Sequence, residues 1–300
     1  QGYITPDNTD VIEYITISTL GNAQDFGDST RGDRHSYSGV SSRTRGCWGG
    51  GFPQATQLTI DYVQISSPGN AIDFGDMFQG RIGAVGLSNE TRGCWAGGYT
   101  YGSGSGTKDT IDYITIASTG NAQDFGDLLS AREFASQPTC SSTTRGIKFR
   151  SGNNVIEYIT IATTGDAVDF GDTVTGTGNG AGLSNATRGI IAGGGASPLQ
   201  NTIEYITIAT LGNSIDFGDL NQGNEGGCGV SSPTRGVVAG MKTPSTFNTM
   251  DYITIASTGN AGDFGDLSQA RKAVTGCANA TRGIWSGGYT PTYVNTMDYV

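Results

Sequence analysis

The 300-residue sequence predicts an all-β repeat protein, and three recurring motifs support this prediction. Asp-Phe-Gly-Asp occurs six times, with starts 45 to 51 residues apart. Thr-Arg-Gly also occurs six times. An acid followed by Tyr and a short apolar stretch recurs at the same period, as in "EYITI" at 13–17 and "DYITI" at 112–116. Units of this length, about 47 residues, cannot each bury a core, so we expect neighbouring units to share one.

Each unit contains four short predicted strands. In the last units, "AVTGCAN" (273–279) and "GIWSGG" (283–288) predict the first and second strands, joined by a tight turn. "TMDYITIAS" (249–257) predicts the third, and the fourth runs through Asp-Phe-Gly-Asp. Four-stranded sheets repeated radially form a β-propeller. In three units the tight turn carries Asn, a residue that suits turn backbone conformations: Asn89, Asn185 and Asn279.

The two ends of the sequence predict the number of blades. The chain starts with a third strand (11–17) and ends with first and second strands (273–288), which can share one closing blade. Residues 1–300 are therefore predicted to be a single six-bladed domain, with 295–300 leading into a further repeat or domain. Because the chain ends inside a repeat motif, we expect the natural chain to be longer. A seven-bladed ring needs roughly 30 more residues.

Composition excludes two classes of partner. The net charge is −10, but 12 of the 27 acidic residues belong to Asp-Phe-Gly-Asp and seven more precede the recurring Tyr. The acidity therefore belongs to the repeat frame, and the sequence has no Lys/Arg stripe of the kind that binds nucleic acid. No apolar run approaches the length of a membrane span. We expect neither nucleic-acid binding nor membrane insertion.

The five cysteines occupy positions that are apolar in the other units, so we expect buried thiols and no disulfide. Three residues after the Thr of Thr-Arg-Gly stand Cys47, Cys94, Ile147, Ile190, Val237 and Ile284. Four residues before that Thr stand Val40, Leu87, Cys140, Leu183, Val230 and Cys277. Cys228 lies two residues before one of these sites.

The recurring charges are predicted to be structural. Protein kinases use one Asp-Phe-Gly to hold magnesium, whereas six copies indicate a scaffold, so Asp25 and Asp28 are frame charges. A buried charge without a partner is costly, and we expect the Thr-Arg-Gly arginines to pair with the recurring acids. These arginines are Arg45, Arg92, Arg145, Arg188, Arg235 and Arg282. Calcium in the Asp-x-x-Asp turns is the alternative. No metal and no cofactor is predicted.

Sequence variation is concentrated in one set of loops. The recurring acid and the first Asp of the fourth strand are always 12 residues apart, whereas Thr-Arg-Gly to the next acid spans 13 to 21 residues. The second-to-third loops and the connections between blades emerge on the same face of an antiparallel blade, and binding residues concentrate on such loops. Candidate ligand-binding residues are Arg34, His35, Phe52, Tyr99, Tyr101, Arg150, Phe247, Tyr289 and Tyr293. These side chains suit contact with a sugar or a protein.

The repeats resemble those of Kelch-type propellers. The matching features are an aromatic residue in the fourth strand, a Tyr beside an acid in the third, and an Arg after the fourth strand in some units (Arg81, Arg132, Arg271). Paired glycines close the second strand at 49–50, 97–98, 193–194 and 287–288. The sequence departs from the Kelch pattern where Phe replaces Trp, where the acid precedes the Tyr, and where the glycine pair fails. The resemblance implies Kelch-like blades.

The repeat "DYITIASTGNAxDFGDL" followed by "ATRGIWSGGYT" is similar to repeats of marine bacteriophage proteins, including tail and virion components. This resemblance implies a non-enzymatic host-recognition module on the viral particle surface. Its partners would be a host surface glycan or protein and other virion proteins. An assembly propeller that docks another virion subunit is the second hypothesis.

A secreted glycan-active enzyme is the third hypothesis, since Asp residues are plentiful and propellers host carboxylate-pair glycosidases. Other catalytic patterns are missing from the sequence. It has one His, and it contains no P-loop and no nucleophile elbow. We therefore expect a protein that is not an enzyme. The oligomeric state stays open at this point.

Overall fold

The computed structural model describes residues 10–32, 36–52, 58–101, 105–132, 138–150, 153–175, 178–195, 198–243 and 245–300. The chain divides into two compact units. The first comprises 1–135, 143–146 and 159–168, and the second comprises 136–142, 147–158 and 169–300.

The first unit contains a two-stranded sheet and two full blades. The two-stranded sheet pairs β1 (Val11–Tyr14) with β2 (Gln24–Asp28). The first blade has the order β3 (Ser38–Ser41), β4 (Arg45–Gly49), β5 (Thr59–Gln64) and β6 (Ile72–Asp76). The second has the order β7 (Val85–Ser88), β8 (Arg92–Ala96), β10 (Gly106–Thr115) and β11 (Gln123–Arg132), with β9 (Tyr99–Thr100) paired to β10.

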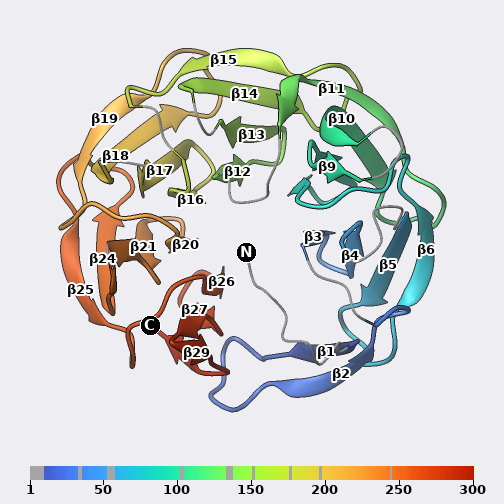
Figure 1. Cartoon of the computed structure of the whole chain (residues 1–300), viewed down its shortest axis with the longest axis horizontal. Coiled ribbons are helices and arrows are strands. Elements are labelled where there is room, and N and C mark those ends of the chain that lie inside the picture. The colour runs from blue at the N-terminus through green and yellow to red at the C-terminus, as the bar shows by residue number, and fades with distance from the viewer. Residues whose placement is uncertain are drawn as a thin grey trace. The chain divides into compact units, whose positions relative to one another are not determined.

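The next blade has residues in both units, in the order β12 (Thr139–Ser141), β13 (Arg145–Phe149), β14 (Val155–Thr160) and β15 (Val168–Asp172). One blade of the second unit has the order β16 (Ala181–Ser184), β17 (Arg188–Gly194), β18 (Gln200–Thr207) and β19 (Ile215–Asp219), and Figure 1 shows these strands side by side. The next blade is β20 (Cys228–Ser231), β21 (Arg235–Ala239), β24 (Thr249–Thr254) and β25 (Gly262–Asp266).

The last sheet contains three strands, β26 (Thr275–Ala278), β27 (Gly283–Ser286) and β30 (Met297–Tyr299). Two small hairpins sit in second-to-third loops: β22 (Lys242–Thr243) with β23 (Ser245–Thr246), and β28 (Tyr289–Thr290) with β29 (Thr292–Tyr293). Residues 297–299, predicted to lead into a further repeat, thus serve as the third strand of this sheet.

The predicted fold class is confirmed. The described residues are all-β, and their antiparallel four-stranded blades are those of a six-bladed β-propeller, with β26, β27 and β30 as the sixth blade. Among the described residues we find no helical segment that could span a membrane. The sharing of a closing blade between the N- and C-terminal strands stays a prediction.

The Asp-Phe-Gly-Asp motif forms a bulge in the fourth strand. In β6, Gly75 lies opposite Ile60 and Asp73 opposite Asp61, so Phe74 is the extra residue. A bulge redirects a side chain, and here the Phe74 ring is buried and meets Tyr62 edge to face at 5.6 Å. The Asp73 carboxylate accepts the Gly75 N–H at 2.9 Å. The motif therefore places an aromatic ring in the core of the blade.

The same motif joins consecutive blades through what we call the blade junction. The Gly69 N–H donates to the Phe26 carbonyl at 2.6 Å, and the Ala71 N–H donates to the Asp28 carbonyl at 2.7 Å. The Asp28 N–H in turn donates to the Asn70 side chain at 3.1 Å. The junction repeats with its N–H donors at Gly120 and Ala122, Gly165 and Ala167, Gly212 and Ser214, and Gly259 and Ala261. Recurrent Gly-Asn-Ala and Asp-Phe-Gly-Asp are thus two halves of one contact.

The cysteines form no disulfide, as predicted, and all five thiols are free. Cys47, Cys94 and Cys140 are buried, and Cys228 is partly buried. Burial raises the pKa of the Cys94 and Cys140 thiols to about 12, which keeps them protonated at neutral pH. These cysteines therefore act as small apolar side chains of the core.

The predicted burial of Cys277 is wrong, because this residue is exposed. Its counterparts in the preceding blades are covered by the glycine of the next Thr-Arg-Gly: a Cβ added at Gly93 would lie closer than 3.0 Å to Val40, and one at Gly236 would lie 2.7 Å from Leu183. Cys277 lies in β26, and no further blade covers it among the described residues. The prediction failed because burial at this position depends on the next blade.

Candidate binding surface

The recurring acids of the third strands lie in the interior of the protein. Asp61, Asp112, Glu157, Glu204 and Asp251 are all buried. Most accept hydrogen bonds from the segment that follows the preceding fourth strand: the Phe78 N–H donates to Asp112 at 3.0 Å, and the Asn221 N–H donates to Asp251 at 3.1 Å. Burial raises the pKa of Asp112, an effect opposed by Arg81 and by the hydrogen bonds that it accepts.

Two of the third-strand acids form ion pairs with the buried arginine that follows the preceding fourth strand. Arg81 Nη2 lies 3.0 Å from Asp112 Oδ1, with both side chains fully buried, and it donates to the Trp95 carbonyl at 2.9 Å. Arg271 Nη1 lies 2.8 Å from Asp298 Oδ2, and Arg271 donates to the Trp285 carbonyl at 3.4 Å, although the Asp298 side chain is partly exposed. These arginines, rather than those of Thr-Arg-Gly, neutralise the two acids.

The prediction that the Thr-Arg-Gly arginines pair with acids is wrong for four of them. Arg45, Arg92, Arg188 and Arg235 make no ion pair with a described residue, and each guanidinium lies over a tyrosine ring, at 4.4 to 5.0 Å from its centroid. Three of them also donate to an isoleucine carbonyl of the next blade: Arg45 to Ile116, Arg92 to Ile161 and Arg188 to Ile255. Arg282 lies over Tyr299 at 4.9 Å, and Arg145 begins β13.

Replacing Arg188 by Met is expected to destabilise the fold by about 1–3 kcal/mol, since it removes a cation–π contact and a hydrogen bond between blades. Arg235→Met is the comparison variant, because Arg235 lies over Tyr252 and 5.8 Å from the Phe264 ring centroid but donates to no isoleucine carbonyl among the described residues. Chemical denaturation of both variants measures the difference. Equal losses would contradict a role for the hydrogen bond.

In three blades the described part of the variable loop lies beside the connection between blades, as predicted. Isolated antiparallel bridges join the two kinds of segment in three blades: Ile82 with Tyr99, Glu225 with Lys242, and Lys272 with Tyr289. In the second of these, Lys242 Nζ also lies 3.2 Å from Glu225 Oε1. In these three blades the second-to-third loop is therefore held against the connection that leads into its own blade.

In the first unit, three predicted aromatic residues come together on these loops. Tyr99 and Tyr101 have ring centroids 4.7 Å apart, and Tyr101 and Phe52 have centroids 6.0 Å apart. Tyr101 is 44% exposed, and Tyr99 and Phe52 are partly buried. Aromatic rings of this kind offer a rigid amphipathic surface for a ligand. We call this group the Tyr101 cluster.

In the second unit, Tyr289 and Tyr293 face each other across the β28–β29 hairpin, with ring centroids 5.3 Å apart. Tyr293 is 47% exposed. Lys272 Nζ lies 5.5 Å from the centroid of the Tyr289 ring. Sequence reasoning missed Lys272, although its place in a blade connection of variable length was a usable signal.

The remaining candidate residues have different surroundings. Arg150 is buried beside Lys148, with its Nε 3.8 Å from Glu157 Oε1, and its role in ligand binding stays a prediction. Glu157 therefore has two cationic neighbours, Lys148 in the second strand β13 and Arg150, the residue after that strand. Phe247 is partly buried and packs against a core cluster of the second unit. Arg34 and His35 lie outside the described residues.

The described side chains that come together on these loops are aromatic rings, four of which carry hydroxyl groups, and one lysine. In the part of the chain that the structure describes, no group of three or more His, Cys, Asp or Glu side chains is placed to hold a metal ion. The first Asp of Asp-Phe-Gly-Asp accepts the N–H of its own glycine, as Asp25 does from Gly27 at 2.9 Å. Neither a scan against protein-family models nor a search of curated proteins found a match to this chain.

Proposed function

We propose that this protein is a non-enzymatic host-recognition module of a virion, whose variable loops contact a host surface glycan or protein. The observation that carries the proposal is the Tyr101 cluster, which places three aromatic rings on variable loops beside a regular frame. The second group, at Tyr289 and Tyr293, has the same position in its own blade. Aromatic residues on rigidly supported loops are typical of recognition surfaces.

Within this proposal the blades are of the Kelch type. Arg81 and Arg271 support this assignment, because each follows a fourth strand and forms an ion pair with the next third-strand acid. Paired glycines with positive φ close the second strands, as at Gly97 (+67°) and Gly98 (+108°). In the first blade the equivalent pair is Gly50 and Gly51, one residue later than the sequence suggested. The virion setting rests on the resemblance of the repeats to those of marine bacteriophage proteins.

The proposal is tested by probing a glycan array and host cells with the recombinant protein and with Tyr101→Ala. We expect the exposed ring to contribute to affinity, so that Tyr101→Ala weakens binding roughly tenfold or more. Leu211→Ala is the matched control, because Leu211 is 55% exposed on the turn between β18 and β19, outside the variable loops. The control should bind as the unmodified protein does.

Three outcomes would contradict the proposal. Binding that survives loss of the exposed rings, with Tyr293→Ala tested in parallel, would remove the variable loops from recognition. No binding to any glycan or cell, together with co-purification of a virion protein, would favour the assembly propeller. Turnover of a polysaccharide that one Asp substitution abolishes would favour a glycan-active enzyme.

A further inference from the structure

A cavity of about 200 Å³ lies in the first unit, between two neighbouring blades. On one side it is lined by Phe74 of β6. On the other side the next blade lines it with the end of β10, the turn that follows and the start of β11, including Tyr113, Ser118, Thr119, Asn121 and Gln123. The Tyr101 cluster lies before the start of β10, so the cavity is at the opposite end of this strand.

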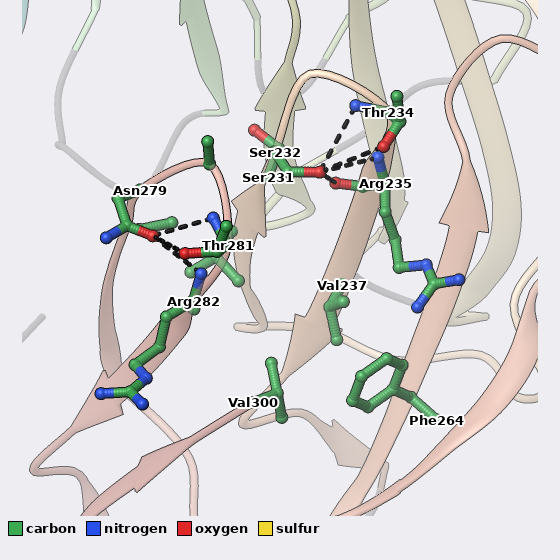
Figure 2. A pocket seen from close by; sticks show the side chains of 14 residues that line it. Ser231, Ser232, Thr234, Arg235, Val237, Phe264, Asn279, Thr281, Arg282 and Val300 are labelled. Carbon is green, nitrogen blue, oxygen red and sulfur yellow. Dashed lines mark hydrogen bonds between the residues drawn. The ribbon is translucent and has the colours of Figure 1, made fainter. Parts of the chain in front are cut away.

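The lining of this cavity is mainly polar and carries no formal charge. It consists largely of hydroxyl and amide side chains, and no Lys, Arg, His, Asp or Glu is among the described residues that line it. A larger cavity of about 260 Å³ in the second unit differs, since Figure 2 shows the apolar side chains of Val237 and Phe264 around it and Arg235 at its side. The cavity of the first unit therefore suits a neutral ligand that forms hydrogen bonds.

The fold fixes the two side-chain amides that line the cavity. Asn121 Oδ1 accepts the Asp76 N–H at 3.1 Å. Gln123 Oε1 accepts the Tyr113 hydroxyl at 2.6 Å. Because an amide group is planar, a bonded oxygen restricts the direction of the NH₂ group beside it. Neither NH₂ group donates to a described residue, so both are donors that a ligand can use.

The blade junction holds the two sides of the cavity together. The Gly120 N–H donates to the Phe74 carbonyl at 2.7 Å, which ties the turn after β10 to β6. Within this turn the Ser118 N–H donates to the Thr115 carbonyl at 3.1 Å. A site that is held in this way loses little conformational freedom when it binds a ligand, and this favours binding.

The blade itself does not require an amide at the position of Gln123. The same position holds a different residue in four other blades: Ile72, Val168, Ile215 and Gly262. The position of Asn121, by contrast, is Asn or Asp at each junction, because its side chain accepts a junction N–H. Among the junctions whose hydrogen bonds the structure describes, this one alone combines the two amides.

We propose that this cavity is a second binding site, which takes a single neutral sugar ring. Its volume equals that of roughly seven water molecules at about 30 Å³ each, which suits one ring better than a peptide segment. The Asn121 and Gln123 NH₂ groups donate to neighbouring hydroxyls of the sugar, and the Ser118 and Thr119 hydroxyls bond to others. The Tyr113 ring contacts the C–H groups of the sugar. The site lies apart from the variable loops, so it does not rest on the function proposed above.

Titration of the full chain with single sugars, followed by NMR, tests this site. The probes are methyl α-glucoside, methyl α-galactoside and methyl α-mannoside, with glucuronate as the charged counterpart. We expect at least one hexoside to shift the Gln123 and Asn121 side-chain NH₂ resonances saturably, with a dissociation constant in the millimolar range. Glucuronate should bind more weakly, because the described lining offers no cation to its carboxylate.

Gln123→Ile is the test variant, since isoleucine occupies this position in two other blades and the fold should tolerate it. It removes one donor and should weaken hexoside binding at least tenfold. Gln24→Ile is the matched control, because Gln24 makes the same bond to the Tyr14 hydroxyl, at 2.6 Å, away from the cavity. Thr119→Ala, at an exposed position of the turn, should also weaken binding, so the test does not depend on the folding of one variant.

Three results would overturn the proposal. They are the absence of a saturable shift with every hexoside, equal binding by the unmodified protein and by both Gln123→Ile and Thr119→Ala, and tighter binding of glucuronate than of any hexoside. Tyr101→Ala separates this site from the variable loops, since it should leave hexoside binding unchanged. A loss of hexoside binding in Tyr101→Ala would place the sugar at the Tyr101 cluster and would also contradict a site at Gln123.

Discussion

Gly171→Ala is expected to destabilise the protein by about 3–5 kcal/mol, one of the two largest effects that the structure predicts. Gly171 has a φ of +140°, and a Cβ there would lie closer than 3.0 Å to the Gly212 carbonyl oxygen. The backbone strain alone costs about 1–3 kcal/mol. The clash adds to it, because the Gly212 N–H also donates to the Phe170 carbonyl and the turn cannot move away without breaking that bond. Urea denaturation measures the loss.

Gly265→Ala separates the two contributions. Gly265 occupies the same position in its motif with a φ of +123°, but a Cβ there meets nothing within 4 Å. The free energy of unfolding of this control should therefore fall only by the cost of backbone strain, about 1–3 kcal/mol. If both variants lose the same amount, contact between the blades is not what requires glycine in Asp-Phe-Gly-Asp.

Arg81→Met should cost about 3–5 kcal/mol, the second large effect, because it leaves the Asp112 carboxylate buried without its cation. Arg43→Met is the control: Arg43 pairs with Glu90 at 3.2 Å, but the two side chains are 88% and 56% exposed. The Arg43→Met change should lower the free energy of unfolding by no more than about 1 kcal/mol. A double variant, Arg81→Met with Asp112→Leu, should recover part of the stability, since it removes both buried charges.

The loss caused by Arg81→Met should shrink as the pH falls. Burial already raises the pKa of Asp112, and removing Arg81 raises it further. The folded variant then binds a proton at a pH where the unfolded chain does not. Its stability therefore rises as the pH falls through the folded-state pKa, and it decreases again as the pH rises. Denaturation from about pH 7 down to about pH 5 measures this trend, and a pH-independent difference from the unmodified protein would contradict it.

Motifs whose structure depends on contacts between residues close in the sequence could be predicted. The fixed hairpin and the recurring Phe indicated the strand order, and the turn asparagines act locally: Asn185 Oδ1 accepts the N–H groups of Thr187 at 2.9 Å and Arg188 at 2.8 Å. Gly-Asn-Ala, by contrast, resembles a simple turn when one repeat is considered alone. Its partner lies in another repeat, 39 to 45 residues away, and a single sequence does not show such pairings.

The ion pairs could not be predicted from a single sequence for the same reason. Arg188 and Glu204 recur at the same period, and their types suggested a pair, but the register places Arg188 over Tyr205. Glu204 instead accepts the Thr175 N–H at 2.8 Å. For the candidate binding surface, loop variability located the aromatic residues, whereas the burial of Arg150 depends on where Glu157 lies across the sheet. Side-chain direction follows from strand register, which residue type alone does not give.

The blade junction also bears on how such a chain can evolve. Its bonds are formed by backbone groups and one Asn or Asp side chain, so neighbouring blades recognise one another in the same way at each position. Recombination between repeats of the coding sequence would then exchange whole blades together with their loops. Each exchanged blade would form the same junction hydrogen bonds with its new neighbours. New combinations of loops could arise in one genetic step without a compensating change in the frame.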